Sequence, residues 1–196
     1  MERLKKKYRT KLEKFNAQKR QIHRLWNIKE QTANLLYFLV KIQSPKNILE
    51  IGTSNGYSTF WLSLAAENSN AEIDTIEADE KRFKLAKENL HNRKNIIQHF
   101  GLAEEIIPEL KKEFDFVFID ANKTDYISYL KMLKNKLAGQ AVIVADNIIS
   151  HRDSVQEYLD FINENPLFET VTLKIDSGLE ISIFRKDESI IINKTG

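Results

Sequence analysis

The stretch ILEIGTSNGYS at residues 48–58 decides the fold class of this chain. An apolar run interrupted by one acid, Glu50, leads into Gly52 and Gly56 and then into a second apolar run. Glycines at these positions let the backbone turn from a strand into a helix and approach a ligand closely. Their Gly-x-x-x-Gly spacing differs from that of dinucleotide folds, and Glu50 would repel a pyrophosphate but not an ammonium or sulfonium group. We expect a ligand-binding loop with Ser58 as the helix cap, the alternative being an ordinary strand-to-helix turn.

Strand-like and helix-like segments alternate on both sides of this loop. We predict strands at residues 47–52, 72–77, 95–100, 114–120 and 141–146, and helices at 32–42, 58–66, 80–90, 103–111, 125–137 and 154–163. Two further runs, 169–175 and 179–185, flank a turn of small polar residues and predict an antiparallel hairpin. Repeated strand–helix units indicate an α/β fold with a mostly parallel, seven-stranded sheet and helices on both faces.

Composition places the chain among single-domain globular proteins. It has 196 residues, of which 42% are hydrophobic and 30% charged. The absence of cysteine excludes disulfides, thiolate zinc sites and cysteine nucleophiles. Neither a membrane-spanning run nor a signal peptide is recognisable, so we expect a cytoplasmic protein with its main domain at residues 26–186 and a flexible tail at 187–196.

The N-terminal arm is strongly basic. The first 24 residues hold ten basic and two acidic side chains, a charge of +8 against −6 for the remaining residues, given the net +2. One helical face collects the apolar residues Leu4, Tyr8, Leu12, Phe15, Ile22 and Trp26. We therefore predict a basic amphipathic helix over residues 1–25. It either binds RNA, an anionic lipid or an acidic substrate, or docks on the domain through this face.

Acidic and amide side chains follow three predicted strands. Glu77 lies 25 residues beyond Gly52, where nucleotide folds hold ribose hydroxyls, although an exposed acid before a helix is the alternative. Asp120 and Asp146 follow strands that we expect to be neighbours, about 4.8 Å apart. They could share one cation, with Asn147 as a third ligand. These hard oxygen donors suit Mg²⁺, Mn²⁺ or Ca²⁺, whereas helix capping and turn formation are the alternative roles.

These motifs resemble the class I S-adenosylmethionine-dependent methyltransferases. Within that class the chain is similar to the metal-dependent catechol and caffeoyl-CoA type O-methyltransferase family with its bacterial relatives. The resemblance extends over residues 26–186 and is most specific at 48–58, at 114–121 with Lys123 and Tyr126, at 144–147 and at 178–182. Trp26 and Ala33 depart from the Met and Gly that many members have.

The resemblance implies a Rossmann-like methyltransferase fold, S-adenosylmethionine as cofactor and a divalent metal, first of all Mg²⁺. It assigns the cofactor contacts to Glu50, Gly52, Ser54, Gly56, Ser58, Glu77, Ala103 and Asp120. The implied metal ligands are Asp120, Asp146 and Asn147. Lys123 matches the family's proposed base and acts beside Asp120.

The expected function is transfer of a methyl group to a hydroxyl of a small catechol-like acceptor, in a homodimer. One alternative acceptor is a hydroxyuridine-type base in tRNA, which the basic arm favours. A more remote alternative is a non-catalytic S-adenosylmethionine-binding protein. The loop spacing and Glu50 argue against a nicotinamide-dependent oxidoreductase.

Overall fold

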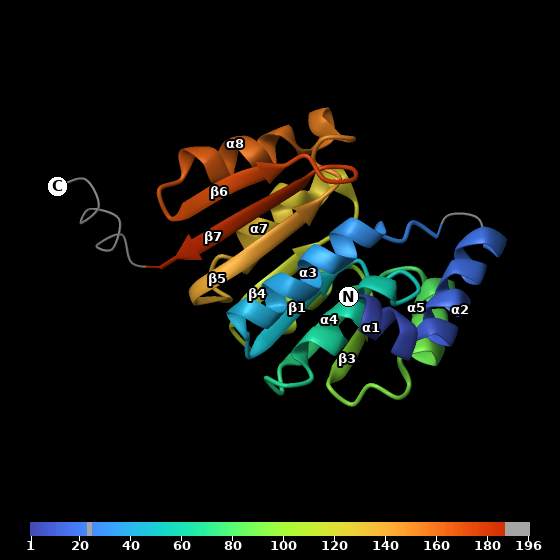
Figure 1. Ribbon diagram of the computed structural model, residues 1–196. Coiled ribbons are helices and arrows are strands. Elements are labelled where there is room, and N and C mark those ends of the chain that lie inside the picture. The colour runs from blue at the N-terminus through green and yellow to red at the C-terminus, as the bar shows by residue number, and fades with distance from the viewer. Residues whose placement is uncertain (23–24, 187–196) are drawn as a thin grey trace.

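The computed structural model describes residues 1–22 and 25–186, which contain a seven-stranded sheet with helices on both faces (Figure 1). The strand order is β3-β2-β1-β4-β5-β7-β6. The strands are β1 (Asn47–Ile51), β2 (Glu72–Glu77), β3 (Ile96–Phe100), β4 (Phe114–Ile119), β5 (Leu137–Asp146), β6 (Phe168–Leu173) and β7 (Leu179–Arg185). The first five strands pair in parallel, and β7 runs antiparallel to β5 and β6. The predicted fold class is confirmed.

Eight α-helices occur within the described residues. They are α1 (Glu2–Lys7), α2 (Arg9–Gln21), α3 (Glu30–Gln43), α4 (Tyr57–Ala66), α5 (Glu80–Leu90), α6 (Ala103–Glu109), α7 (Tyr126–Leu133) and α8 (Gln156–Glu164). The prediction of a helix through residue 137 was wrong: α7 ends at Leu133, and Leu137 already pairs with Phe114 at the start of β5. No helix of residues 1–22 and 25–186 is long and apolar enough to span a membrane.

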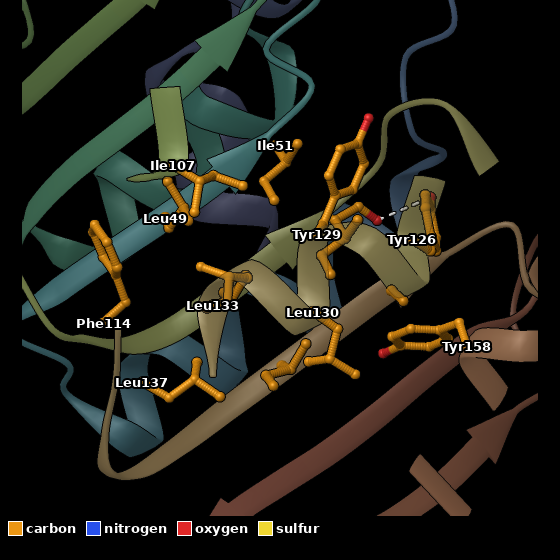
Figure 2. Packing of buried hydrophobic residues seen from close by; sticks show 14 of the residues in the cluster. Leu49, Ile51, Ile107, Phe114, Tyr126, Tyr129, Leu130, Leu133, Leu137 and Tyr158 are labelled. Atoms are coloured by element: carbon orange, nitrogen blue, oxygen red, sulfur yellow. Dashed lines mark hydrogen bonds between the residues drawn. The ribbon is translucent and has the colours of Figure 1, made fainter. Parts of the chain in front are cut away.

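The two faces of the sheet bury separate apolar cores. One core packs α6, α7 and α8 against the sheet and includes Leu49, Leu133 and Tyr158 (Figure 2). The other core joins α2, α3, α4 and α5 to the opposite face. Strand β4 contributes to both, as expected for a run that is apolar at nearly every position.

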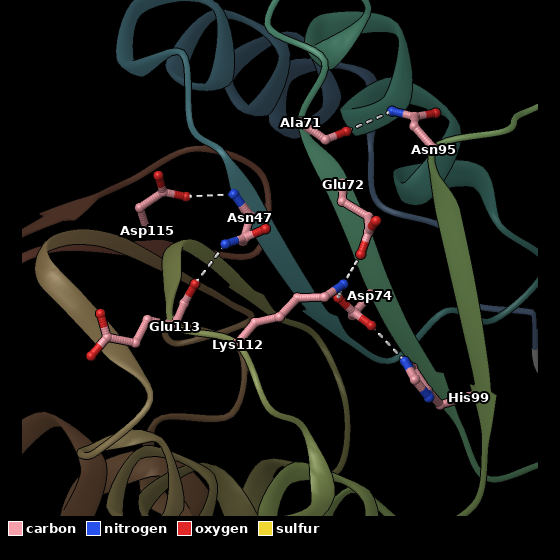
Figure 3. Close-up of polar contacts among 9 residues, drawn as sticks. All are labelled: Asn47, Ala71, Glu72, Asp74, Asn95, His99, Lys112, Glu113 and Asp115. Carbon is pink, nitrogen blue, oxygen red and sulfur yellow. Dashed lines mark hydrogen bonds and ion pairs between the residues drawn. The ribbon is translucent and has the colours of Figure 1, made fainter.

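A buried acid on β2 is held by basic side chains at the amino-terminal side of the sheet. Asp74 accepts from Nζ of Lys112 at 2.9 Å and lies 2.7 Å from Nε2 of His99 (Figure 3). Lys112 also contacts Glu72. These contacts pair a buried carboxyl group with polar partners, and Asp74, His99 and Lys112 do not line the cavity described below.

The N-terminal arm is not one helix. It breaks at Tyr8 into α1 and α2, and α2 ends at Gln21. Phe15 is fully buried in the second core, whereas Trp26 is 68% exposed and lies in an extended segment before α3. The predicted apolar face therefore docks α2 but does not continue to Trp26. The expected flexible tail at residues 187–196 lies outside the described residues.

Candidate active site

A cavity of about 750 Å³ opens at the carboxyl ends of the parallel strands. Its walls come from the loop after β1, the end of β2, the residues after β3 and β4, the loop after β5 and the segment before α3. Carboxyl ends of parallel strands at the point where the strand order reverses are the usual ligand site of open α/β sheets. Here β1 is flanked by β2 on one side and β4 on the other, which places the cavity at that reversal.

The loop between β1 and α4 adopts an unusual backbone. Gly52, Ser54 and Gly56 have φ values of +104°, +51° and +85°, of which the first and last favour glycine. A Cβ on Gly52 would collide with the carbonyl oxygen of Asp120. Gly56, not Ser58, occupies the N-cap position of α4, so the predicted cap was wrong. The loop thus lies directly against the end of β4.

Glu77 is fixed at the cavity by backbone donors. Its Oε2 accepts from the N–H of Ser54 at 2.7 Å and its Oε1 from the N–H of Asp79 at 2.9 Å. Nε of Arg82 lies 3.3 Å from Oε1. The neighbouring acid Asp79 caps α5 by accepting from the N–H of Arg82. Glu77 is therefore the oriented acid of this pair, whereas Asp79 serves the helix.

Glu50 is fully buried and does not line the cavity. Its Oε2 accepts from Thr75 at 2.6 Å and from Thr59. Burial raises its pKa to about 7, because these hydroxyl donors only partly offset the cost of desolvating the charge. The structure therefore brings Gly52, Ser54, Ser58, Glu77, Ala103 and Asp120 to the cavity wall but not Glu50 or Gly56.

The polar groups after β4 form a connected set. Nζ of Lys123 donates to Oδ1 of Asp120 at 2.8 Å and to the hydroxyl of Tyr126 at 3.1 Å. The buried Tyr126 hydroxyl also lies 3.2 Å from the carbonyl oxygen of Ile119 and 3.1 Å from that of Asp146. Tyr126 thereby links the ends of β4 and β5 beneath Lys123.

Asp146 is the last residue of β5 and Asn147 follows it, beside this set. Burial, and next the negative charge of Asp120, raise the pKa of Asp146. Asn147 lines the cavity with a left-handed backbone, φ +66°. Among the described residues no three His, Cys, Asp or Glu side chains gather into a metal site. Asp120 and Asn147 line the cavity, whereas Asp146 is not among its lining residues. Carboxylate and amide oxygens are the donors that a hard divalent cation prefers.

Several buried polar atoms of cavity-lining residues have no hydrogen-bond partner within the described part of the chain. Within residues 1–22 and 25–186, Oγ of Ser54, Oδ1 of Asn55 and the side-chain amide of Asn27 are buried without a hydrogen bond. All three residues line the cavity. Buried polar atoms are rarely left unpaired, so this pattern fits a polar ligand such as an amino-acid moiety. Sequence reasoning missed Asn27 and Arg82, because neither stands at a strand end or in a glycine loop.

The sequence of this chain is similar to those of named O-methyltransferases. A family model described as O-methyltransferase matches residues 3–191. The catechol O-methyltransferase of Niastella koreensis is 34% identical over 130 residues, which make up 63% of this chain and 58% of that protein. The catechol O-methyltransferase of Mycobacterium tuberculosis is 32% identical over 128 residues, 62% of this chain and 57% of that protein. The matches thus span less than two thirds of these relatives.

Solved structures share the fold. The cofactor-bound protein Rv0187 from MTB superimposes with a TM-score of 0.81 at 24% identity, covering 91% of this chain and 89% of that one. The O-methyltransferase from Bacillus cereus in complex with SAH gives 0.73 at 25% identity, covering 81% and 83%. The family match covers nearly the whole chain. The chain therefore belongs to the O-methyltransferase family, within the class I S-adenosylmethionine-dependent methyltransferases that its motifs resemble.

Proposed function

We propose that this protein transfers a methyl group from S-adenosylmethionine to a hydroxyl of a small catechol-like acceptor, with a divalent cation at the site. The observation that carries the proposal is a single cavity lined by the oriented carboxylate of Glu77 and by Asp120, Lys123 and Asn147. The carboxylate suited to ribose hydroxyls, Glu77, thus lines the same cavity as the side chains of Asp120, Lys123 and Asn147.

The cofactor would be held by the loop after β1 and by the end of β2. Glu77 already accepts one backbone N–H group on each carboxylate oxygen, and Oε2 retains a lone pair for a ribose hydroxyl. The unpaired atoms of Ser54, Asn55 and Asn27 suit the polar groups of the methionine part. The buried Glu50 would not contact the cofactor. It would support the start of α4 and strand β2 beside the loop through its hydrogen bonds to Thr59 and Thr75. When bound, the cofactor supplies a methyl group on a positively charged sulfur.

Asp120, Asp146 and Asn147 would hold the divalent cation. The like charges of the two aspartates, one of them largely buried, favour a cation at this position. A divalent ion supplies positive charge that favours the ionised form of a nearby hydroxyl. Mg²⁺ is the first choice, since the donors are all oxygen.

Lys123 would act as the base. In its neutral form, Nζ would take the proton of the acceptor hydroxyl, so that the oxygen is anionic when the carbon–oxygen bond forms and the carbon–sulfur bond breaks. A free phenol has a pKa near 10 and is mostly protonated at neutral pH, which is why such a base is needed. Asp120 and Tyr126 hold Nζ in position.

The catechol-like acceptor is favoured by the relatives, two of which are named catechol O-methyltransferases. The tRNA alternative is based on the basic charge of the arm. The apolar face of α2 packs on the domain, which is the docking role that the sequence left open for the arm. We also retain a homodimer as a proposal.

A methyl-transfer assay tests the proposed function. Purified protein is incubated with S-adenosylmethionine labelled in its methyl group and with catechols, hydroxycinnamoyl thioesters or tRNA, with Mg²⁺ or with excess EDTA. We expect label in a catechol only when Mg²⁺ is present. Undiminished transfer in EDTA would overturn the metal role, and label in tRNA alone would overturn the acceptor class.

A further inference from the structure

The N-terminal arm reaches the loop after β1 through a buried amide cluster. Gln18 of α2, Asn55 of the loop and Asn89 of α5 are each at least nine-tenths buried. Oε1 of Gln18 accepts from Nδ2 of Asn55 at 3.1 Å and from Nδ2 of Asn89 at 2.8 Å. Nε2 of Gln18 donates to Oδ1 of Asn89 at 3.1 Å, and Nδ2 of Asn89 donates to the carbonyl oxygen of Asn55 at 2.9 Å. Three segments distant in sequence are thus joined by four hydrogen bonds.

The cluster acts at the strained part of the loop. Asn55 lies between Ser54 and Gly56, both with positive φ, and the N–H of Ser54 donates to Glu77. A non-glycine residue in the left-handed region persists only where its surroundings hold it. Gln18 is hydrogen-bonded to Asn55, and Asn55 directly follows Ser54, whose backbone N–H orients Glu77.

The position of Gln18 on α2 also indicates a specific role. Gln18 and Phe15 are the buried residues of this helix, and an apolar side chain would be the simpler choice at a docking face. With such a side chain, the buried amides of Asn55 and Asn89 would lose partners, which is costly in an interior. The arm reinforces the contact through Lys11, whose Nζ donates to the carbonyl oxygen of Asn89. Figure 1 shows α2 lying beside α5.

We infer that Gln18 is a positioning residue for the cofactor, and that the basic arm serves to hold the loop after β1 in its binding conformation. This inference rests on the proposed function, because that loop is the one assigned to S-adenosylmethionine. Gln18 does not line the cavity and acts only through Asn55.

Calorimetry with S-adenosylhomocysteine tests the inference on Gln18→Met, a substitution that keeps side-chain length but removes the amide. The matched control is Gln21→Met, at the exposed end of the same helix. We expect the Kd to rise about tenfold for Gln18→Met, the scale of one or two lost hydrogen bonds, and to stay unchanged for Gln21→Met. In the methyl-transfer assay, KM for the cofactor should rise while kcat at saturating cofactor is retained. In the absence of cofactor, amide hydrogen exchange of residues 52–57 should be faster in Gln18→Met than in the unsubstituted protein.

The outcomes separate this inference from the proposed function. If the unsubstituted protein fails to bind S-adenosylhomocysteine, the proposed function fails. If it binds and Gln18→Met binds equally well with unchanged exchange at residues 52–57, the inference is overturned. If Gln18→Met does not fold, Gln18→Ala, which removes the same contacts without inserting a long apolar side chain, is measured by the same criteria. Loss of the folded state in both variants overturns the inference, because the cluster would then maintain the fold and not the loop.

Discussion

Nζ of Lys123 lies 2.8 Å from Oδ1 of Asp120, and both side chains line the cavity. The two residues are three positions apart, but the pairing depends on the tight turn that leads from β4 through Asn122 into the short helix Lys123–Asp125. Tyr126 adds a second acceptor for Nζ at 3.1 Å. The proposed base is thus held between a carboxylate and a phenol hydroxyl.

Replacement of Lys123 by methionine tests its role as base. We expect Lys123→Met to lower kcat by about 10²–10⁴-fold, the usual contribution of a general base, and to leave the Kd for S-adenosylhomocysteine unchanged. Steady-state kinetics and calorimetry give the two readouts. Lys131→Met, on the exposed side of α7, is the matched control. An active Lys123→Met enzyme would exclude this lysine as the base.

Substitution of Glu77 and substitution of Asp146 should have different effects, the first on cofactor binding and the second on metal binding. Glu77→Ala removes the acceptor of the Ser54 and Asp79 N–H groups, so we expect it to weaken S-adenosylhomocysteine by about 1.5–3 kcal/mol. Asp146→Ala removes a charged donor and should lower Mg²⁺ affinity and turnover by several orders of magnitude. Calorimetry of each variant with each ligand gives the crossed pattern.

A failure of that pattern has a defined meaning. If Asp146→Ala loses S-adenosylhomocysteine as strongly as Glu77→Ala does, Asp146 supports the loop and is not a metal ligand. Thermal unfolding of both variants serves as the control, because Asp146 is buried and its removal acts on β5 as well.

The sequence predicted those parts of the site that stand at the ends of regular elements. The ends of β4 and β5 were found because an apolar run marks the strand and the polar residue after that run marks its end, as at Asp120 and Asp146. Glu77 was found by its place at the end of the next predicted strand, 25 residues beyond Gly52. Parallel pairing then places such residues at one edge of the sheet. This argument needs only local patterns and a general rule of topology.

The remaining features depend on long-range packing. The break of the arm at Tyr8 leaves the apolar periodicity intact, yet it redirects α2 so that Phe15 and Gln18 face the domain. Asn27 reaches the cavity from an extended segment that has no periodic pattern. The start of β5 at Leu137 was missed because its pairing with Phe114 is set by the neighbouring strand. None of these contacts has a local signature in the sequence.

Glu50 should make stability depend on pH. Burial raises its pKa in the folded state from 4.5 to about 7. A carboxyl whose folded pKa is raised gives stability that is complete below the unfolded pKa and is lost as the pH rises through the folded pKa. The wild-type free energy of unfolding should therefore fall between about pH 5 and pH 8, by at most about 3 kcal/mol for this group. Urea unfolding at both pH values should show a smaller fall for Glu50→Gln.

The comparison with Glu50→Gln isolates one carboxyl from others in the same range. Asp146 also has a raised pKa, but it titrates in both proteins and cancels in the difference. Equal pH dependence of the two proteins would mean that Glu50 remains ionised when folded, with its charge balanced by donors other than Thr59 and Thr75.

Gly52 should not tolerate a side chain. Its φ of +104° disfavours any side chain, and a Cβ would meet the carbonyl oxygen of Asp120, a backbone atom that cannot rotate away. We expect Gly52→Ala to lower the free energy of unfolding by about 1–3 kcal/mol or more and to weaken S-adenosylhomocysteine, because β1 and β4 must separate at the cavity. Gly139→Ala is the control, since a Cβ there meets no atom within 4 Å of described protein. Denaturant unfolding and calorimetry of both variants decide the point: equal stability of the two would show that the loop after β1 can move away from Asp120 at no cost.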